Sequence, residues 1–414
     1  MLRTRRGEPA AADAPAGSLR RALAALCVTE IVSYGVIYYA FPVLAVQITA
    51  GTGWSRTAVT AAYSAGNLAG AAAGIPAGRL LQRHGPRAVM TVSSVLGVAS
   101  VAGIAAAPTY WWFLTAWLAA GTASAGLYYP PAFAALTVWY GPRRVQAVTA
   151  LTLAAGFAST IFAPLTSALA GQVSWREVYL ILAAVLAAVT IPAHALALRP
   201  PWPRPADPPA APAKGKMAAA RGADRQVLAS RAFLQLVTAA TLCAFAQYAA
   251  LVNLVPLLTG RGLSPGLAAW ALGLGGAGQV AGRLCYRVLD ARMGPRGRTV
   301  AVIAAGSAVT LLLGLLPGPA ALLLTAAVIA GAVRGVFTLT EATLVADQWG
   351  ADRYAVINGV FNAPLTAAGA IAPTVGAGIA AVTGSYPLMF AILAAVAATG
   401  AALAGTAPAP SRTG

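Results

Sequence analysis

Two charged side chains lie inside one strongly apolar stretch near the end of the chain. The stretch Gly331–Trp349 reads GAVRGVFTLTEATLVADQW, and it contains Arg334 and Glu341. Thr338 lies between them, four residues after Arg334. At about 3.6 residues per turn, the three side chains share one face of a helix. A charge at the depth of a bilayer costs about 2.5–3.5 kcal/mol on insertion scales, so it normally faces a protein interior or a water-filled cavity.

Arg334 has the chemistry of an anion clamp, because a guanidinium stays charged in a protein and binds a carboxylate through two parallel hydrogen bonds. Glu341 has the chemistry of a proton carrier. Burial favours the neutral form of a carboxyl group, whereas a nearby arginine favours the charged form. We therefore expect Glu341 to stay charged until a substrate displaces Arg334, and then to bind a proton. The alternative is a structural Arg–Glu pair that locks two helices together.

Glu30 is a second candidate for proton coupling. It lies in the first apolar run, four residues before Tyr34, so both side chains lie on one helix face. The alternative for Glu30 is a solvated position near the cytoplasmic end of that run.

The composition predicts an all-α integral membrane protein. Of the 414 residues 59% are hydrophobic and only 9% are charged, whereas a soluble domain has about 25% charged residues. The net charge of +18 does not indicate a nucleic-acid partner, because the basic residues lie in short segments between apolar runs. The cysteines are far apart and the two histidines are isolated, so we expect no metal, no disulfide framework and no cofactor.

The sequence contains twelve apolar runs, and each is near the roughly 20 residues that a helix needs to cross a bilayer core. They lie at 22–48, 56–78, 88–107, 110–138, 146–171, 176–198, 231–258, 265–286, 299–316, 319–346, 354–380 and 385–405.

A Pro-rich segment divides these runs into two sets of six. Residues 199–230 begin RPPWPRPADPPAAPAKGK, which is typical of a flexible linker. We expect a bundle of six helices over 22–198, a second over 231–405, and polar tails at 1–21 and 406–414.

Charge predicts the orientation. With the N-terminus inside, 24 of the 28 Lys and Arg residues lie in cytoplasmic segments and three lie on the opposite face. This asymmetry predicts a multi-pass protein of the cytoplasmic membrane with both termini in the cytoplasm.

The two halves share sequence landmarks. Gly78-Arg79 followed by Gly85-Pro86-Arg87 recurs as Gly282-Arg283 followed by Gly294-Pro295-Arg296. Trp139 and Pro164 recur about 210 residues later as Trp349 and Pro373. Parallel repeats of six helices are typical of transporters whose substrate site lies near the middle of the membrane.

The motif GRLLQRHGPR at 78–87 resembles the loop between helices 2 and 3 of the major facilitator superfamily. That family usually has an acidic residue where this chain has Gln82, and the acidic residue occurs in the second copy as Asp290. Glycine in such a loop allows a tight turn and a close approach of helices. The resemblance implies gating roles for Gly78, Arg79, Arg83, Gly85, Arg87, Gly282, Arg283, Asp290 and Arg296.

Within the superfamily, the chain is most similar to bacterial monocarboxylate and oxalate/formate transporters. The motifs that carry this resemblance are Tyr34-Gly35, Tyr128-Tyr-Pro-Pro131 and Trp175-Arg176. That group has a basic residue in its first helix, where this chain has Glu30.

The superfamily resemblance implies that helices 1, 4, 7 and 10 line a central cavity. The candidate substrate-binding residues are therefore Tyr34, Tyr128, Gln247, Asn253, Arg334 and Thr338. The alternative for the tyrosines and amides is hydrogen bonding between helices, which contributes about 0.6 kcal/mol in a membrane protein.

These features predict a secondary transporter and not an enzyme. We expect it to move a small organic anion, such as a monocarboxylate, by alternating access, and we expect this transport to be coupled to protons. We expect the protein to work as a monomer. One alternative is a proton-driven exporter of drugs or secondary metabolites. Another is a membrane sensor that does not transport, although the longest soluble segment is only the Pro-rich linker.

Overall fold

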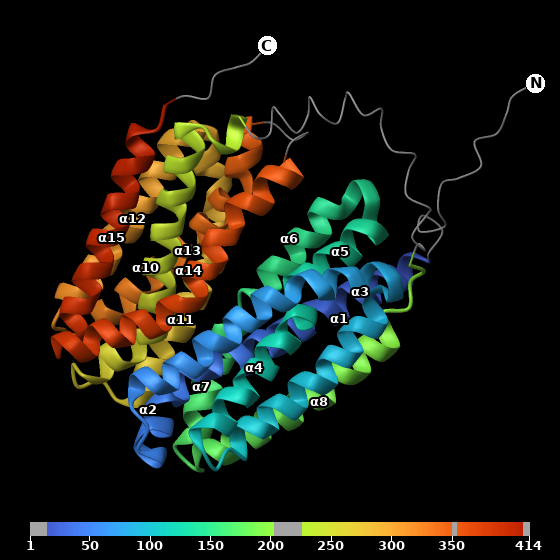
Figure 1. Cartoon of the computed structure of the whole chain (residues 1–414), viewed down its shortest axis with the longest axis horizontal. Coiled ribbons are helices and arrows are strands. Elements are labelled where there is room, and N and C mark those ends of the chain that lie inside the picture. The colour runs from blue at the N-terminus through green and yellow to red at the C-terminus, as the bar shows by residue number, and fades with distance from the viewer. Residues whose placement is uncertain (1–14, 203–225, 350–353, 409–414) are drawn as a thin grey trace, which may run out of the picture. The chain divides into compact units, whose positions relative to one another are not determined.

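The computed structural model describes residues 15–202, 226–349 and 354–408 (Figure 1). Most of the predicted linker and parts of both tails lie outside this part of the chain. The described residues form helices and no strand. The elements are α1 (Ala16–Ser33), the π-helix η1 (Tyr34–Tyr39), α2 (Ala40–Thr52), α3 (Arg56–Ala105), α4 (Tyr110–Leu127), α5 (Tyr129–Tyr140), the 3₁₀-helix η2 (Gly141–Arg143), α6 (Arg144–Ala155), α7 (Ala158–Ala170), α8 (Trp175–Ala197), α10 (Arg231–Thr259), α11 (Pro265–Arg292), α12 (Pro295–Leu315), α13 (Ala320–Trp349), α14 (Tyr354–Thr383) and α15 (Tyr386–Thr406).

These helices account for the twelve predicted spans. Within the described residues, nine helical segments are long and apolar enough to cross a membrane. One of them, α3, holds two predicted spans joined at Gly85, which has φ 76° and ψ 168°. The remaining spans are α11 and the pair α4 and α5, which meet at the extended residue Tyr128.

Two predicted loops are shorter than expected. The second predicted span ends at 78, but the helix continues to His84 before the bend at Gly85. The predicted run 265–286 likewise continues to Arg292. The extra turns hold arginines and Gln82, which are good helix formers that a count of apolar residues overlooks.

The chain divides into two compact units. The first comprises Met1–Tyr38, Ala69–Ala158 and Val173–Ala210, and the second comprises Tyr39–Leu68, Ser159–Gln172 and Ala211–Gly414. The predicted division into bundles at 22–198 and 231–405 stays a prediction.

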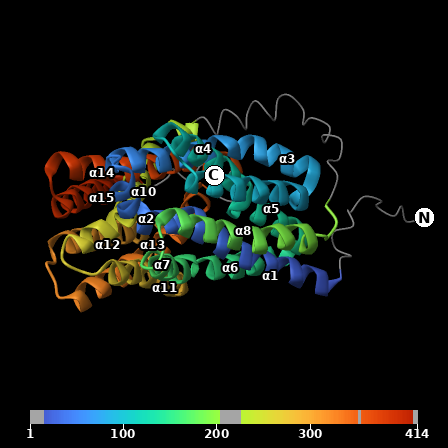
Figure 2. The same ribbon diagram turned by 90° about the horizontal axis from the view of Figure 1, so that it is seen from below.

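In the first unit, α1 packs along α8 and α6 (Figure 2). Its core holds apolar side chains from α1, α5 and α6, among them Leu26, Leu136 and Leu151. The entrance to α8 has a capping box, in which the Ser174 hydroxyl accepts from the Glu177 amide and the Glu177 carboxylate accepts from the Ser174 amide.

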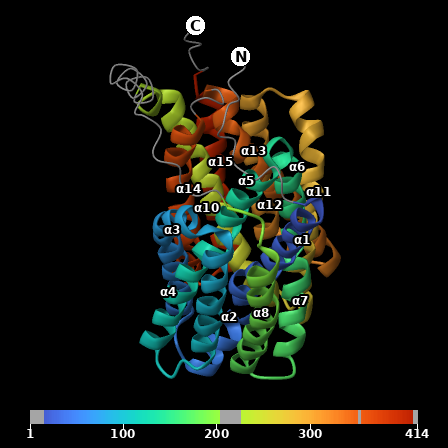
Figure 3. The same ribbon diagram turned by 90° about the vertical axis from the view of Figure 1, so that its right-hand side faces the viewer.

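In the second unit, α10 packs against α14 (Figure 3), and α11 packs against α13. Two segments from the first half of the sequence, Tyr39–Leu68 and Ser159–Gln172, belong to the same unit. There the Gln47 amide donates to the Ala170 carbonyl at 2.8 Å, and the Thr160 hydroxyl donates to the Gly273 carbonyl at 2.9 Å.

Candidate functional site

Arg334 lies on α13 and lines a cavity inside the second unit. The cavity is lined by α10, α11, α12 and α13, and its volume is about 40 Å³. Gln247 and Thr310 also line it, and the rest of the lining is apolar or glycine. The Arg334 guanidinium donates to the Gln279 side-chain oxygen on α11, at a long 3.4 Å.

Close backbone contact between α11 and α13 positions this arginine. A Cβ atom built at Gly331 would lie 1.8 Å from the Gly275 carbonyl oxygen, and one built at Gly335 would lie 2.1 Å from the Gln279 carbonyl oxygen. Small residues allow such approaches in membranes, where packing rather than water drives helix association. This close approach of the two helices places the Gln279 side chain within hydrogen-bonding reach of Arg334.

Thr338 and Glu341 follow Arg334 along α13. The Thr338 hydroxyl donates to the Arg334 carbonyl within the helix at 3.0 Å. Both Arg334 and Glu341 are half-buried. No ion pair joins them in the described structure, so the expected pair is not formed in this conformation.

Gln247 and Asn253, the two predicted substrate-binding residues of α10, have different surroundings. Gln247 faces the cavity and donates to the Cys243 sulfur at 3.1 Å. Asn253 is fully buried, donates to the Ala249 carbonyl at 2.9 Å, and lies against Gly376 of α14. The structure therefore brings Gln247 and Arg334 to one cavity and leaves Asn253 outside its lining.

The predicted tyrosines of the first unit meet directly. The rings of Tyr34 and Tyr128 stack with centroids 4.0 Å apart and an interplanar angle of 11°. Tyr129 adds a tilted ring 5.0 Å from Tyr34. Tyr34 opens the π-helix η1 and Tyr128 separates α4 from α5, so two interrupted helices meet at this cluster. Such interruptions are frequent at functional sites and at transporter binding sites.

Glu30 lies one turn before the tyrosine cluster and is fully buried. Neither carboxylate oxygen has a protein hydrogen-bond partner, and the nearby Ser33 hydroxyl has none. This burial differs from the solvated alternative considered for the sequence.

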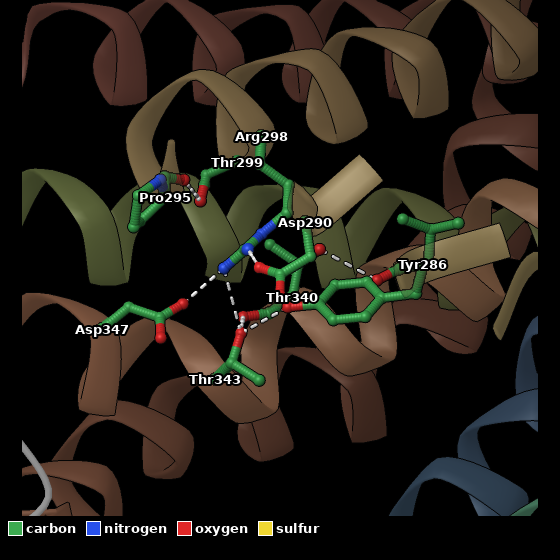
Figure 4. A network of polar contacts seen from close by, with 9 residues as sticks. Tyr286, Asp290, Pro295, Arg298, Thr299, Thr340, Thr343 and Asp347 are labelled. Atoms are coloured by element: carbon green, nitrogen blue, oxygen red, sulfur yellow. Dashed lines mark hydrogen bonds and ion pairs between the residues drawn. The ribbon is translucent and has the colours of Figure 1, made fainter. Parts of the chain in front are cut away.

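A network around Arg298 was missed by the sequence analysis (Figure 4). The Arg298 side chain is only 1% exposed and forms ion pairs with Asp290 of α11 and Asp347 of α13. It also donates to Thr343 at 3.2 Å, and its guanidinium lies 5.1 Å from the centre of the Tyr286 ring. The predicted acidic residue Asp290 is therefore paired, but with Arg298 and not with the arginines named from the repeat.

The other members of the second copy have separate contacts. Arg296 donates to the Gly405 carbonyl. Gly282 lets α11 approach α13, since a Cβ atom there would lie 2.0 Å from the Ala332 carbonyl oxygen. Arg283 is buried.

In the first copy, the glycine that makes the turn is Gly85. A Cβ atom there would lie 3.1 Å from the Trp202 ring, whose indole donates to the Gln82 carbonyl at 3.2 Å. Gly78 lies inside α3 with open space around it, so it makes neither a turn nor a close contact. Arg87 donates to the Ala195 carbonyl at 2.8 Å, and the side chains of Arg79 and Arg83 are exposed.

The described residues hold no group of three or more His, Cys, Asp or Glu side chains that could bind a metal ion. Cys27, Cys243 and Cys285 are free thiols.

The family model of the Major Facilitator Superfamily matches residues 26–363 and 237–413. The chain therefore belongs to the major facilitator superfamily: it is a multi-pass membrane transporter of small molecules and not an enzyme. The predicted all-α membrane fold of twelve helices is confirmed.

Two solved structures of a bacterial homologue of the human lysosomal transporter Spinster resemble this chain. The inward-facing, unoccupied form has a TM-score of 0.68 and 18% identity, covering 94% of this chain and 95% of that one. The inward-facing, occupied form has a TM-score of 0.65 and 17% identity, covering 92% and 93%. No curated protein matches the chain. At these identities the likeness concerns the fold, and the similarity to monocarboxylate and oxalate/formate transporters stays a prediction.

Proposed function

We propose that this transporter moves a small organic anion, such as a monocarboxylate, across the cytoplasmic membrane by alternating access coupled to protons. The observation that carries this proposal is the surroundings of Arg334. Its guanidinium lines a cavity in an apolar helix bundle, and no carboxylate forms an ion pair with it in the described part of the chain. The transporter works as a monomer, with both termini in the cytoplasm.

Arg334 carries a positive charge that no carboxylate of the described residues compensates. Burying a charge is costly unless it is paired and hydrogen-bonded. Arg334 has one long hydrogen bond to a neutral amide, whereas Arg298, on the neighbouring helix α12, has two carboxylate partners. A substrate carboxylate offers Arg334 the pairing that the protein does not supply. Thr338, one turn after Arg334 on α13, is a further candidate for contact with substrate, and Tyr34, Tyr128 and Asn253 stay candidates on the sequence resemblance alone.

Proton coupling is assigned to Glu30 and Glu341. An ionised carboxylate without partners is expensive to bury, so Glu30 is suited to carry a proton in this conformation and to release it when its surroundings become hydrated. Glu341 follows Arg334 on the same helix and is suited to respond to substrate at the arginine.

The test uses proteoliposomes that contain a pH-sensitive dye. Small carboxylates, amines and lipophilic cations are added in turn, and the passive entry of weak acids into protein-free vesicles is subtracted. We expect net proton flux with a carboxylate and its loss in Arg334→Gln. The matched control Arg292→Gln removes an exposed charge from the last turn of α11 and should leave the flux unchanged. Carboxylate flux that survives in Arg334→Gln contradicts the proposal.

A second candidate function is the proton-driven export of cationic compounds. The observation that favours it is the burial of Glu30 beside a cluster of tyrosine rings, because aromatic faces and carboxylates both attract cations. Proton flux with amines or lipophilic cations, lost in Glu30→Gln and retained in Arg334→Gln, identifies this activity.

A further inference from the structure

The cavity beside Arg334 is lined by four helices of a single unit. Gln247 and Leu251 belong to α10, Val309 and Leu313 to α12, and Ala327 to α13. Gly275 of α11 also lines it, at a point where the backbones of α11 and α13 approach closely. The cavity is thus a recess inside one helix bundle.

Its polar groups gather at one end. Gln247 is the first cavity residue along α10 and Gly306 the first along α12, and the two face each other, since a Cβ atom built at Gly306 would lie 3.4 Å from the Gln247 amide nitrogen. Arg334 is the last cavity residue along α13, and its neighbour Val333 also faces Gly306. Gln247, Gly306 and Arg334 therefore share one level.

The opposite end is apolar. Leu254 follows Gln247 by two helical turns, which is about 10 Å at a rise of about 1.5 Å per residue. Leu313 and Ala327 occupy the same far end on α12 and α13. Thr310, between the ends, donates its hydroxyl to the Gly306 carbonyl at 2.7 Å, so it offers little polarity to the cavity.

We infer that this recess receives the aliphatic tail of the substrate while Arg334 binds its carboxylate, so that the transporter selects short-chain carboxylates. This inference rests on the proposed function. A volume of about 40 Å³ corresponds to about three water molecules, since each needs about 10–15 Å³ by this measure. A methylene or methyl group takes about the space of one water, so the tail has about three carbons beyond the carboxyl carbon.

Burial of each methylene then improves binding until the recess is full. The expected gain is about fourfold in affinity per added carbon, equivalent to about 0.8 kcal/mol for each buried CH₂. Affinity therefore rises from acetate through propionate to butyrate. Pentanoate and hexanoate gain nothing further, because their tails exceed the volume of the recess.

The experiment measures ligand-induced thermal stabilisation of the full-length purified protein, which reports affinity without assuming a coupling ion. Sodium salts from acetate to hexanoate are compared at equal concentration, with sodium chloride as reference. Ala327→Leu fills the apolar end and should move the optimum to a shorter chain. Leu251→Ala enlarges the recess and should move it to a longer chain. Leu311→Ala, at an exposed position of α12 outside the lining, should leave it at butyrate.

Opposite shifts in Ala327→Leu and Leu251→Ala support the inference, and Leu251→Ala alone decides it where the filled variant does not fold. An unchanged optimum in Leu251→Ala overturns it, because the tail then lies elsewhere. In that case, carboxylate binding that is still lost in Arg334→Gln leaves the proposed anion transport standing. The absence of stabilisation by every carboxylate in the wild-type protein contradicts the proposed function and the inference together.

Discussion

Two arginines of the second unit have opposite surroundings. Arg298 is enclosed by Asp290, Asp347 and the ring of Tyr286. Arg334 has a long contact with an amide and a cavity beside it. The first arrangement suits a structural tie between α11, α12 and α13, and the second suits a site that an exchangeable anion completes.

The tie around Arg298 predicts an ordered series of stability losses. Arg298→Ala leaves two carboxylates facing each other, and removing one partner of a buried pair costs about 3–5 kcal/mol. Asp290 and Asp347 are 55% and 31% exposed, so water reduces this cost and we expect about 2–3 kcal/mol. Asp347→Asn should cost less, and Asp290→Asn the least. Thermal unfolding in detergent measures the series.

High salt provides a control, because it screens exposed charges. It should diminish the effect of Asp290→Asn more than that of Arg298→Ala. A larger loss for Asp290→Asn than for Arg298→Ala would contradict the assignment of Arg298 as the centre of the network.

Part of this site could be predicted from sequence. A charge inside an apolar run is visible in a list of residues, so Arg334, Glu341 and Glu30 could be named. The partners could not, because Gln279 and Asp347 reach their arginines from other helices, and the distance between helices is not encoded in spacing along one of them. Arg298 lies only two residues beyond the recognised Arg296, yet its burial depends on α11 and α13.

At the scale of elements, α11 and α13 make a close backbone contact in the described part of the second unit. Gly331 lies against the Gly275 backbone, where any side chain would overlap a carbonyl oxygen. We expect Gly331→Ala to separate the two helices and to destabilise the protein by about 1–3 kcal/mol or more, as overpacking does. It should also weaken the placement of Gln279 and reduce transport. Thermal unfolding and transport rate report the two effects.

Gly378→Ala in α14 is the matched control. A Cβ atom there meets nothing within 4 Å, and alanine favours a helix over glycine by about 1 kcal/mol. This variant should therefore be unchanged or slightly more stable. Equal stability of both variants would show that α11 and α13 do not depend on the close approach.

The positions of the spans could be predicted because the length of an apolar run and the thickness of a bilayer are directly related. The interruptions of the helices within these spans could not be predicted from the length of the apolar runs. The π-helix at Tyr34–Tyr39 interrupts a continuous apolar run, and hydropathy does not report backbone geometry. The break at Tyr128 had a signal in the prolines that follow it, since Pro130 lies in the first turn of α5, where the missing N–H of proline has no helical partner to lose.

At the scale of the whole molecule, the asymmetry of positive charge predicts which face is cytoplasmic. In a cysteine-free variant, Gly318→Cys, between α12 and α13, should react with a membrane-impermeant maleimide added to intact cells. Met293→Cys, between α11 and α12, should react only after the cells are broken. The reverse pattern would invert the topology and place the arginine-rich loops outside.

We propose that the protein is a gradient-driven transporter of a small organic anion that uses Arg334. The most direct measurement is the uptake of radiolabelled pyruvate, a strongly ionised carboxylate, into proteoliposomes under an imposed pH gradient. We predict accumulation above equilibrium that a protonophore abolishes, that is absent in Arg334→Gln, and that persists in Arg292→Gln. The sign of the gradient that drives uptake distinguishes symport from antiport. Accumulation that is insensitive to the protonophore, or equal in the wild type and Arg334→Gln, would contradict the account.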